Sequence, residues 1–552
     1  MAARLTTFVV VAIVAVTLIA GLIVGAQRDD SDGPVDLIVH NARIYTATEK
    51  GSMAEAVAIR GNQILRVGSD REILRLKRPQ TATVDAKGAA VLPGFNDTHL
   101  DFFDGGTGLD RIDLADAAAI EDVDRRIRDW AEANPDRPWV LGRGWHSDVF
   151  PDNLPTRQML DRLVPDRPAL LLSADGHTAW VNSKALRLAK IGRRTESPAH
   201  GLIAREARTA EPAGTLTGAA IGLVDKLVPP PTAAERDRAL RAATAEAHRY
   251  GVTSVQDVTG SADELAAYAE ARRTGDLQVR VYAAFPVLND LPDSELDRLQ
   301  AITAKYPDDP LFKAGALDLT LEDDGHPDAS GAAATPSLHF QPDDFNRLVR
   351  RLDARGWQIV TDAASDVAVR MTLNAYEHAV RSNPGRKGER RHRIQSVESV
   401  ADEDLPRLPP LGVLASMRPL DDEANGNAGA PPLARRIASG LHRLTFGSGW
   451  PAASLNPLLG LSAVLTPPAD PDAEDSARLS LKSAIDAYTS GPAWASFDEQ
   501  RKGTIAPGML ADIVVLSDDI FKAAASDLPA VRVEMTIFDG KVVYRRAERA
   551  TN

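Results

Sequence analysis

The chain has 552 residues, of which 44% are hydrophobic, and its formal net charge is −13. This length exceeds one ordinary domain, so a large domain with a smaller one is expected. The acidic balance argues against a nucleic-acid partner, which needs a clustered basic surface. Because the chain has no cysteine, it has no disulfide, thiolate metal site or cysteine nucleophile. Any metal would need His, Asp, Glu or a modified Lys.

Residues 1–30 predict either a transmembrane anchor or a signal peptide. An uncharged run of 19 residues extends from Phe8 to Ala26, and a helix of that length spans about 28 Å, close to the hydrocarbon thickness of a bilayer. Arg4 precedes the run and acidic residues follow it, which favours placing the rest of the chain outside. The sequence Val24-Gly25-Ala26 also fits a signal cleavage site. We therefore expect a protein that is membrane-anchored and faces outside, or one that is secreted or periplasmic.

The β-rich segments at the two ends of the chain predict one discontinuous domain. Residues 34–93 and 503–552 contain short apolar stretches separated by Gly and Asn turns, and we expect them to form a single β-sandwich. Between them, residues 94–502 alternate amphipathic helical segments with apolar runs such as WVLG, ALLLS, TSVQDV, VRVYAAF and WQIVTDA. This alternation predicts the α/β class and a TIM-like (β/α)8 barrel. A doubly wound open sheet is the alternative, disfavoured because no GxGxxG follows an early strand.

Two segments inside the predicted barrel have little hydrophobic periodicity. They extend from Glu322 to Pro336 and from Asp421 to Pro432, and both are rich in Gly, Ala, Pro and acidic residues. We expect them to be loops. Long loops after barrel strands shape the mouth, so a lid or a substrate contact is the alternative to a plain surface loop.

Several sequence blocks resemble the amidohydrolase superfamily. PGFNDTH precedes the predicted barrel, KGTIAPGMLADIVVL follows it, and GVTSVQD, RHRIQSVES, LGVLASMRP and LTFGSGWPAASLNPLLG occur in order between them. The block from Gly142 to Leu186 is similar to the amidohydrolase 3 family, which includes YtcJ-like proteins and N-substituted formamide deformylases. The resemblance covers residues 36–545. It implies a barrel beside a small sandwich, and hydrolysis of C–N bonds other than peptide bonds in a small-molecule substrate.

The resemblance also implies a metal centre, and this chain departs from it. The family pattern has an HxH after the first strand, a carboxylated lysine, two further histidines and a late aspartate. Such ligands hold divalent ions that acidify a bound water, and the aspartate moves protons. Only the first position keeps its residue type. In order, the six positions hold His99, Asp101, Asp318, Asp362, Ser396 and Gly449.

We therefore expect no metal cofactor and assign no catalytic residue. A divalent ion such as Mg²⁺ or Ca²⁺, held by His99 and the three aspartates, is the alternative. Otherwise these carboxylates need a basic partner, and Arg418, which follows LASM, is expected to pair with Asp362 or Asp101. His177 matches a family position that lines the substrate mouth, although it is equally consistent with a structural role. We predict His177 and Arg418 as substrate-binding residues.

Two functions follow from these patterns. The first is an amidohydrolase-type hydrolase whose metal-dependent activity is lost or much reduced. The alternative is a non-catalytic envelope protein that binds a small molecule or a partner at the barrel mouth. Other hydrolase and nucleotide-binding motifs, namely GxSxG, GxxxxGK[ST] and HExxH, do not occur in the sequence. Expected partners are a small molecule and, through the N-terminal segment, a membrane.

Overall fold

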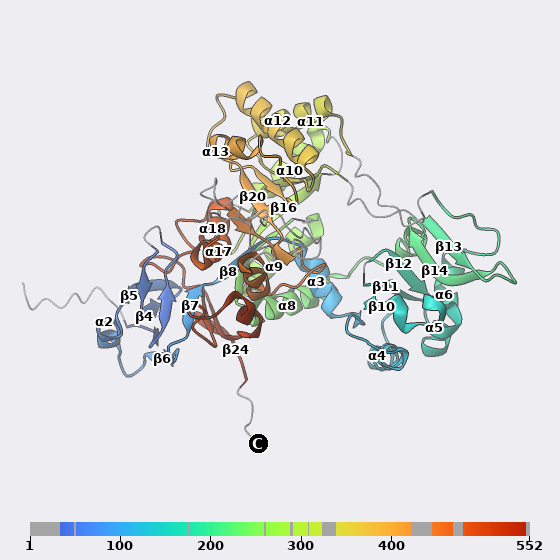
Figure 1. Cartoon of the computed structure of the whole chain (residues 1–552), viewed down its shortest axis with the longest axis horizontal. Helices are drawn as coiled ribbons and strands as arrows, with labels where there is room; N and C mark the ends of the chain where they lie inside the picture. Colours follow the sequence, from blue (N-terminus) through green and yellow to red (C-terminus); the bar gives the residue numbers. More distant parts are fainter. Residues whose placement is uncertain are drawn as a thin grey trace, which may run out of the picture.

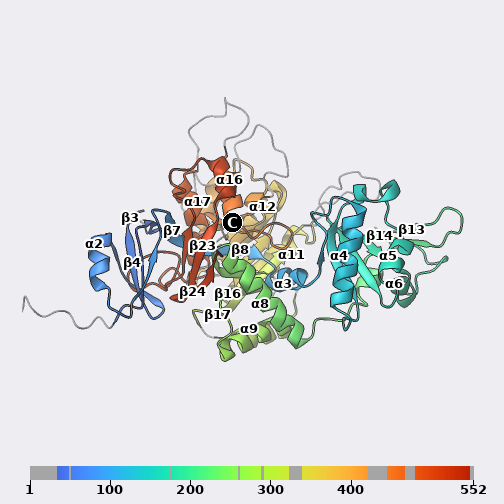
Figure 2. The ribbon, with the colours of Figure 1, turned by 90° about the horizontal axis from the view of Figure 1, so that it is seen from below.

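The computed structural model describes residues 34–48, 51–174, 176–199, 201–258, 261–287, 291–306, 308–322, 338–420, 444–466 and 479–547. A central barrel has the β-sandwich on one side and a separate lobe on the other (Figures 1 and 2). Within these ranges no helix is long and apolar enough to cross a membrane. The apolar run from Phe8 to Ala26 lies outside them. The segment 421–432 also lies outside them, and of the segment 322–336 only Glu322 is described.

The barrel consists of eight parallel strands, as predicted. Neighbouring strands pair in the order β21-β20-β19-β18-β17-β16-β15-β8. The ring closes because Gly449 N donates to His99 O at 2.8 Å and Asp101 N donates to Trp450 O at 2.8 Å. The strand bounds are β8 (Phe95–Leu100), β15 (Val252–Asp257), β16 (Arg280–Val287), β17 (Phe312–Thr320), β18 (Gln358–Asp362), β19 (Arg393–Gln395), β20 (Leu414–Met417) and β21 (Leu444–Phe446).

Helices cover the outside of the barrel. Strand β15 is buried along its whole length, because helices cover one face and the barrel interior the other. Helix α11 shows the matching amphipathic pattern, with Phe345, Leu348 and Leu352 buried. The covering helices are α3 (Phe102–Leu109), α8 (Ala233–Arg249), α9 (Ala262–Thr274), α10 (Asp293–Thr303), α11 (Pro342–Ala354), α12 (Asp366–Ser382), α13 (Leu408–Leu411), α16 (Pro457–Leu465), α17 (Leu481–Ala487) and α18 (Ser490–Ala495).

The residues between α3 and α8 in the sequence form the lobe, which is built on a six-stranded sheet (Figure 1). Its strand order is β13-β14-β12-β11-β10-β9. The runs WVLG and ALLLS contribute to β10 and β11 of this sheet, so their assignment to barrel units was wrong. The lobe contains β9 (Ile112–Asp113), α4 (Ile120–Ala133), β10 (Val140–Trp145), α5 (Arg157–Leu163), β11 (Ala169–Ser173), β12 (Thr178–Val181), α6 (Ser183–Leu188), β13 (Gly201–Arg205), β14 (Pro212–Gly218) and α7 (Gly222–Asp225).

Both ends of the described chain enter one β-sandwich. Its two sheets have the orders β5-β4-β1-β6 and β24-β23-β22-β7-β2-β3. Antiparallel pairing of β7 with β22, in which Val91 faces Val515, joins the two parts of the sequence. The strands are β1 (Leu37–His40), β2 (Arg43–Tyr45), β3 (Met53–Ala54), β4 (Ala56–Arg60), β5 (Gln63–Gly68), β6 (Ala82–Asp85), β7 (Ala90–Pro93), β22 (Ile513–Leu516), β23 (Val533–Phe538) and β24 (Lys541–Arg545).

Candidate functional site

The family positions all lie at or just beyond the carboxyl ends of barrel strands. In a parallel barrel these ends share one face, which is where catalytic side chains of such folds gather. Residues that are more than 300 positions apart in the sequence therefore surround a single mouth. The six positions are His99 on β8, Asp101 just after it, Asp318 on β17, Asp362 at the end of β18, Ser396 directly after β19 and Gly449 after β21. Arg418, predicted to bind substrate, follows β20 at the same face.

His99 is the one position that keeps the family's residue type, and it is neutral at physiological pH. Its pKa is lowered to about 3, mainly by burial and also by the charges of Arg418 and Arg393, while a hydrogen bond with Gln395 opposes the shift. Its Nδ1 atom is buried and has no hydrogen-bond partner among the described residues. A neutral imidazole with an unpaired nitrogen can form a hydrogen bond with a bound ligand.

Asp318, which the resemblance places at the family's lysine position, is buried and hydrogen-bonded. Gln395 Nε2 donates to Asp318 Oδ1 at 2.8 Å in the barrel interior. Burial raises the pKa of Asp318 well above its usual range, the charge of Asp362 adds to this, and Arg393 opposes it. The carboxyl group is therefore engaged by an amide, and its surroundings favour the protonated form.

Arg418 covers the position of the family's late aspartate. Gly449 has a φ of +68°, and a Cβ atom placed on it would lie 3.0 Å from Arg418 Cδ and 3.6 Å from Arg418 Nη1. The Arg418 side chain thus lies where an aspartate side chain would have to extend. Its pairing with Asp101 or Asp362 stays a prediction.

His177 lies in the lobe, in the turn between β11 and β12. Its carbonyl oxygen accepts a hydrogen bond of 3.2 Å from Gly218 N, at the end of β14. His177 therefore belongs to the lobe, whereas the other predicted site residues lie on or next to barrel strands. Its predicted contact with substrate is not tested by this geometry.

The sequence analysis missed the polar side chains of β19. Arg393, only 1% exposed, donates through Nη1 to Gln256 Oε1, and Gln395 is fully buried beside Asp318. The signal was present in the triplet RIQ, because alternate strand residues share a face and both polar side chains must then point inward. Ser396, the residue predicted for this part of the site, follows the strand with a φ of +57°.

Glu322 was also missed, because it begins a segment that we read as irregular. Its Oε1 atom accepts from Ala364 N at 2.5 Å and Ser365 N at 2.8 Å, and its Oε2 atom accepts from Ser365 Oγ at 2.7 Å. The carboxylate therefore stabilises the N-terminal end of α12, where the helix dipole favours negative charge.

The donor set at the mouth does not fit a family-type metal centre. Across the described ranges, no group of three or more His, Asp or Glu side chains could hold one ion. This also gives no support to the alternative Mg²⁺ or Ca²⁺ site, for which we had grouped His99 with the three aspartates. The physical reasons are that Asp318 is bonded to Gln395 in surroundings that favour its protonated form, and that Arg418 adds a positive charge beside Gly449.

A parallel eight-stranded barrel with polar residues at its carboxyl face, beside a sandwich built from both chain ends, defines an amidohydrolase-type barrel protein. Residues 82–544 match the amidohydrolase family (Amidohydro_3). The chain belongs to this family.

Relatives with similar sequences match nearly the whole chain. LONG AFTER FAR-RED 3 of Arabidopsis thaliana is 29% identical over 92% of this chain and 91% of its own length. The putative amidohydrolase YtcJ of Bacillus subtilis is 29% identical over 92% of this chain and 99% of its own. The N-substituted formamide deformylase of Arthrobacter pascens is 26% identical over 93% and 98%, respectively.

Solved structures share the fold at lower sequence identity. An uncharacterized metal-dependent hydrolase from Pyrococcus furiosus superposes with a TM-score of 0.68 at 22% identity, covering 86% of this chain and 97% of that one. A second, from Pyrococcus horikoshii, gives a TM-score of 0.67 at 20% identity, covering 89% and 99%.

Proposed function

We propose that this amidohydrolase-family protein has lost most or all metal-dependent hydrolysis of non-peptide C–N bonds. The observation that carries the proposal is Arg418 lying over Gly449, where the family resemblance places the proton-transferring aspartate. Hydrolysis of this kind needs a complete ligand set for the ion and a group that moves protons. Of these, the mouth retains only His99.

The replacements act together rather than singly. Burial raises the pKa of Asp318 and so weakens it as a metal ligand, because ligands must be deprotonated to bind. A guanidinium cannot act as a base and repels a divalent cation at short range. Asp318 and Arg418 therefore disfavour the same ion from two sides of the mouth.

The alternative function is a non-catalytic protein that binds a small molecule at the mouth. It is supported by three buried polar atoms that have no hydrogen-bond partner in the described part of the chain, His99 Nδ1, Gln395 Oε1 and Ser396 Oγ. Buried polar groups are nearly always paired in native proteins, so a polar ligand or water is needed to satisfy them. Arg418 adds a cation for an acidic ligand.

Elemental analysis of the full chain, purified without chelator, tests the main proposal. We expect zinc well below one equivalent, the same as in chelator-treated protein, and no hydrolysis of N-acyl or N-substituted formamide substrates. Stoichiometric zinc with activity that disappears in His99→Ala would overturn the proposal. A restored variant serves as the positive control, with Arg418→Ala added to make room: Asp101→His, Asp318→Lys, Asp362→His, Ser396→His and Gly449→Asp.

We also propose that the chain is exported, on the basis of the apolar run from Phe8 to Ala26 and the charges around it. An anchored protein sediments with membranes and resists carbonate extraction. A cleaved signal peptide instead releases a shortened soluble protein. Recovery of the intact chain from the cytosol contradicts both.

A further inference from the structure

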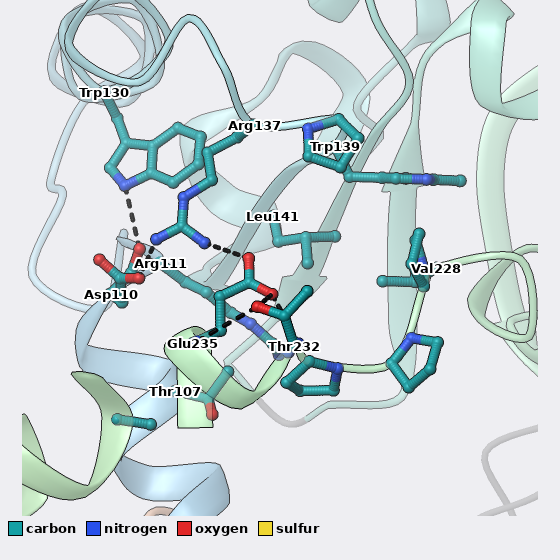
Figure 3. A pocket seen from close by; sticks show the side chains of 15 residues that line it. Thr107, Asp110, Arg111, Trp130, Arg137, Trp139, Leu141, Val228, Thr232 and Glu235 are labelled. Atoms are coloured by element: carbon teal, nitrogen blue, oxygen red, sulfur yellow. Dashed lines mark hydrogen bonds and ion pairs between the residues drawn. The ribbon is translucent and has the colours of Figure 1, made fainter. Parts of the chain in front are cut away.

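A cavity of about 230 Å³ lies between the lobe and the barrel helices (Figure 3). Its lining comes from the end of α3, from α4 and β10 of the lobe, and from the segment that leads into α8. The walls are mainly apolar and aromatic, formed by Trp130, Trp139, Leu141, Val228 and 229–231, a run of three prolines. These residues are separate from those of the barrel mouth.

Two arginines line the cavity, and the first is fully engaged. Arg137 Nη1 donates to Glu235 Oε1 at 2.6 Å, and its Nη2 atom donates to Asp110 (Figure 3). Glu235 also accepts from Thr232 at the start of α8, and Trp130 Nε1 donates to Asp110 O at 3.2 Å. This network holds one wall in place, and both Nη atoms of Arg137 are already engaged by carboxylates.

Arg111 differs from Arg137 because it has no such partner. Its Nε atom is buried without a hydrogen bond, and no carboxylate of the described residues forms an ion pair with it. Burial lowers its pKa; Asp104 and Asp225 oppose this from exposed positions, where water screens their charges, and Arg143 adds to it. An arginine remains charged in such surroundings.

We propose that this cavity binds a small carboxylate with an aromatic or otherwise apolar body. The carboxylate lies on the Arg111 guanidinium, whose planar fork matches a carboxylate in two hydrogen bonds. The apolar body packs between Trp139 and the prolines. Ligand sites typically combine such apolar walls with a few polar groups that fix orientation. The volume restricts the ligand to about one or two rings.

The chemistry of the walls decides between ligand classes. A cationic ligand is disfavoured because Asp110 pairs with Arg137, and Glu235 pairs with Arg137 and, at 4.0 Å, with Arg238. Arg111 forms no such ion pair among the described residues. A neutral ligand leaves a half-buried guanidinium without a counter-charge, which costs free energy. Only an anion satisfies Arg111 and covers the tryptophans at the same time.

Calorimetry on the full-length, detergent-purified protein tests the proposal, with 2-naphthoate as the probe and 2-naphthamide as its neutral counterpart. We expect 2-naphthoate to bind at one site, at least about tenfold more tightly than the amide. Arg111→Gln should remove this preference and leave amide binding nearly unchanged. Arg187→Gln, which alters an exposed arginine of α6 in the same lobe, is the matched control and should bind like the wild type.

Three results overturn the proposal: equal binding of acid and amide, no binding at millimolar concentration, or loss of binding in Arg418→Gln with retention in Arg111→Gln. The last would place the ligand in the barrel mouth. The comparison of acid with amide uses wild-type protein alone, so it decides the matter even if Arg111→Gln does not fold. Trp139→Leu then locates the site, since it should weaken binding of both probes.

Discussion

Gly449 and Arg418 together hinder the introduction of an aspartate at position 449. The glycine adopts a φ of +68°, a conformation that residues with a Cβ atom rarely adopt, and the arginine occupies the space beside it. A side chain at position 449 must therefore accept backbone strain and displace Arg418. The residue type at position 449 is thus coupled to Arg418, which a position-by-position reading of the sequence does not reveal.

Gly449→Asp alone should therefore destabilise the protein without producing zinc binding. We expect a loss of about 1–2 kcal/mol in the free energy of unfolding, from the positive φ and the contact with Arg418. Urea denaturation measures it, and Gly449→Ala separates strain from charge. The double variant with Arg418→Ala should recover part of the loss. An unchanged unfolding midpoint in both single variants contradicts the described packing.

At the scale of elements, the sandwich is attached to the barrel helices by a polar contact. Tyr45 on β2 donates its hydroxyl to Asp486 on α17, at 3.0 Å from Oδ1 and 3.1 Å from Oδ2. Burial raises the pKa of Asp486 to about 6, while the Tyr45 hydrogen bond and the charge of Lys482 oppose the shift. This carboxyl group therefore titrates in a range where most aspartates are already ionised.

The pKa of Asp486 predicts a specific loss of stability on raising the pH. Since the folded-state pKa lies above the ordinary value of 3.8, the folded protein binds the proton more tightly than the unfolded chain. For this group, the free energy of unfolding should fall by about 3 kcal/mol between about pH 4 and pH 6 and then level off. The fall should be smaller by this amount in Asp486→Asn. Asp527→Asn, at an exposed site, is the control. Identical pH profiles for wild type and Asp486→Asn contradict the prediction.

At the scale of the whole molecule, the N-terminal and C-terminal segments pair with each other and contact the barrel. Strand β22 pairs with β7, and Arg280 at the start of β16 donates to Asp512 at 2.5 and 2.9 Å and to Asp539 at 2.9 Å. Arg280 and Asp512 are both buried. The C-terminal strands therefore provide a sheet partner to the N-terminal segment and counter-charges to the barrel.

Deleting residues from Ala511 onward should make the protein aggregate. The deletion exposes the edge of β7, uncovers the apolar faces of the sandwich and leaves Arg280 buried without a counter-charge. Size-exclusion chromatography and thermal unfolding measure the effect. Deletion of residues 548–552, which retains β24, is the control. A soluble, cooperatively unfolding protein ending at Leu510 would show that the two ends do not depend on each other.

Local sequence patterns determined much of this architecture. The repeated alternation of helical and apolar segments predicted the barrel, and the turn-rich segments at both ends predicted the composite sandwich, because hydrophobic periodicity reflects which faces are buried. The family resemblance selected six residues, and in the structure they lie at or just beyond the carboxyl ends of barrel strands. The location of these residues at the strand ends did not by itself determine their chemical roles.

Only the tertiary structure separated the lobe from the barrel and completed the two candidate sites. WVLG and ALLLS have the same local pattern as barrel strands, and a strand's sheet is decided by distant pairing partners rather than by its own residues. The hydrogen bond from Gln395 to Asp318, the position of Arg418 beside Gly449, and Arg111 in a tryptophan-lined cavity likewise join residues from different elements. Such contacts depend on how those elements pack together, which no local window of sequence contains.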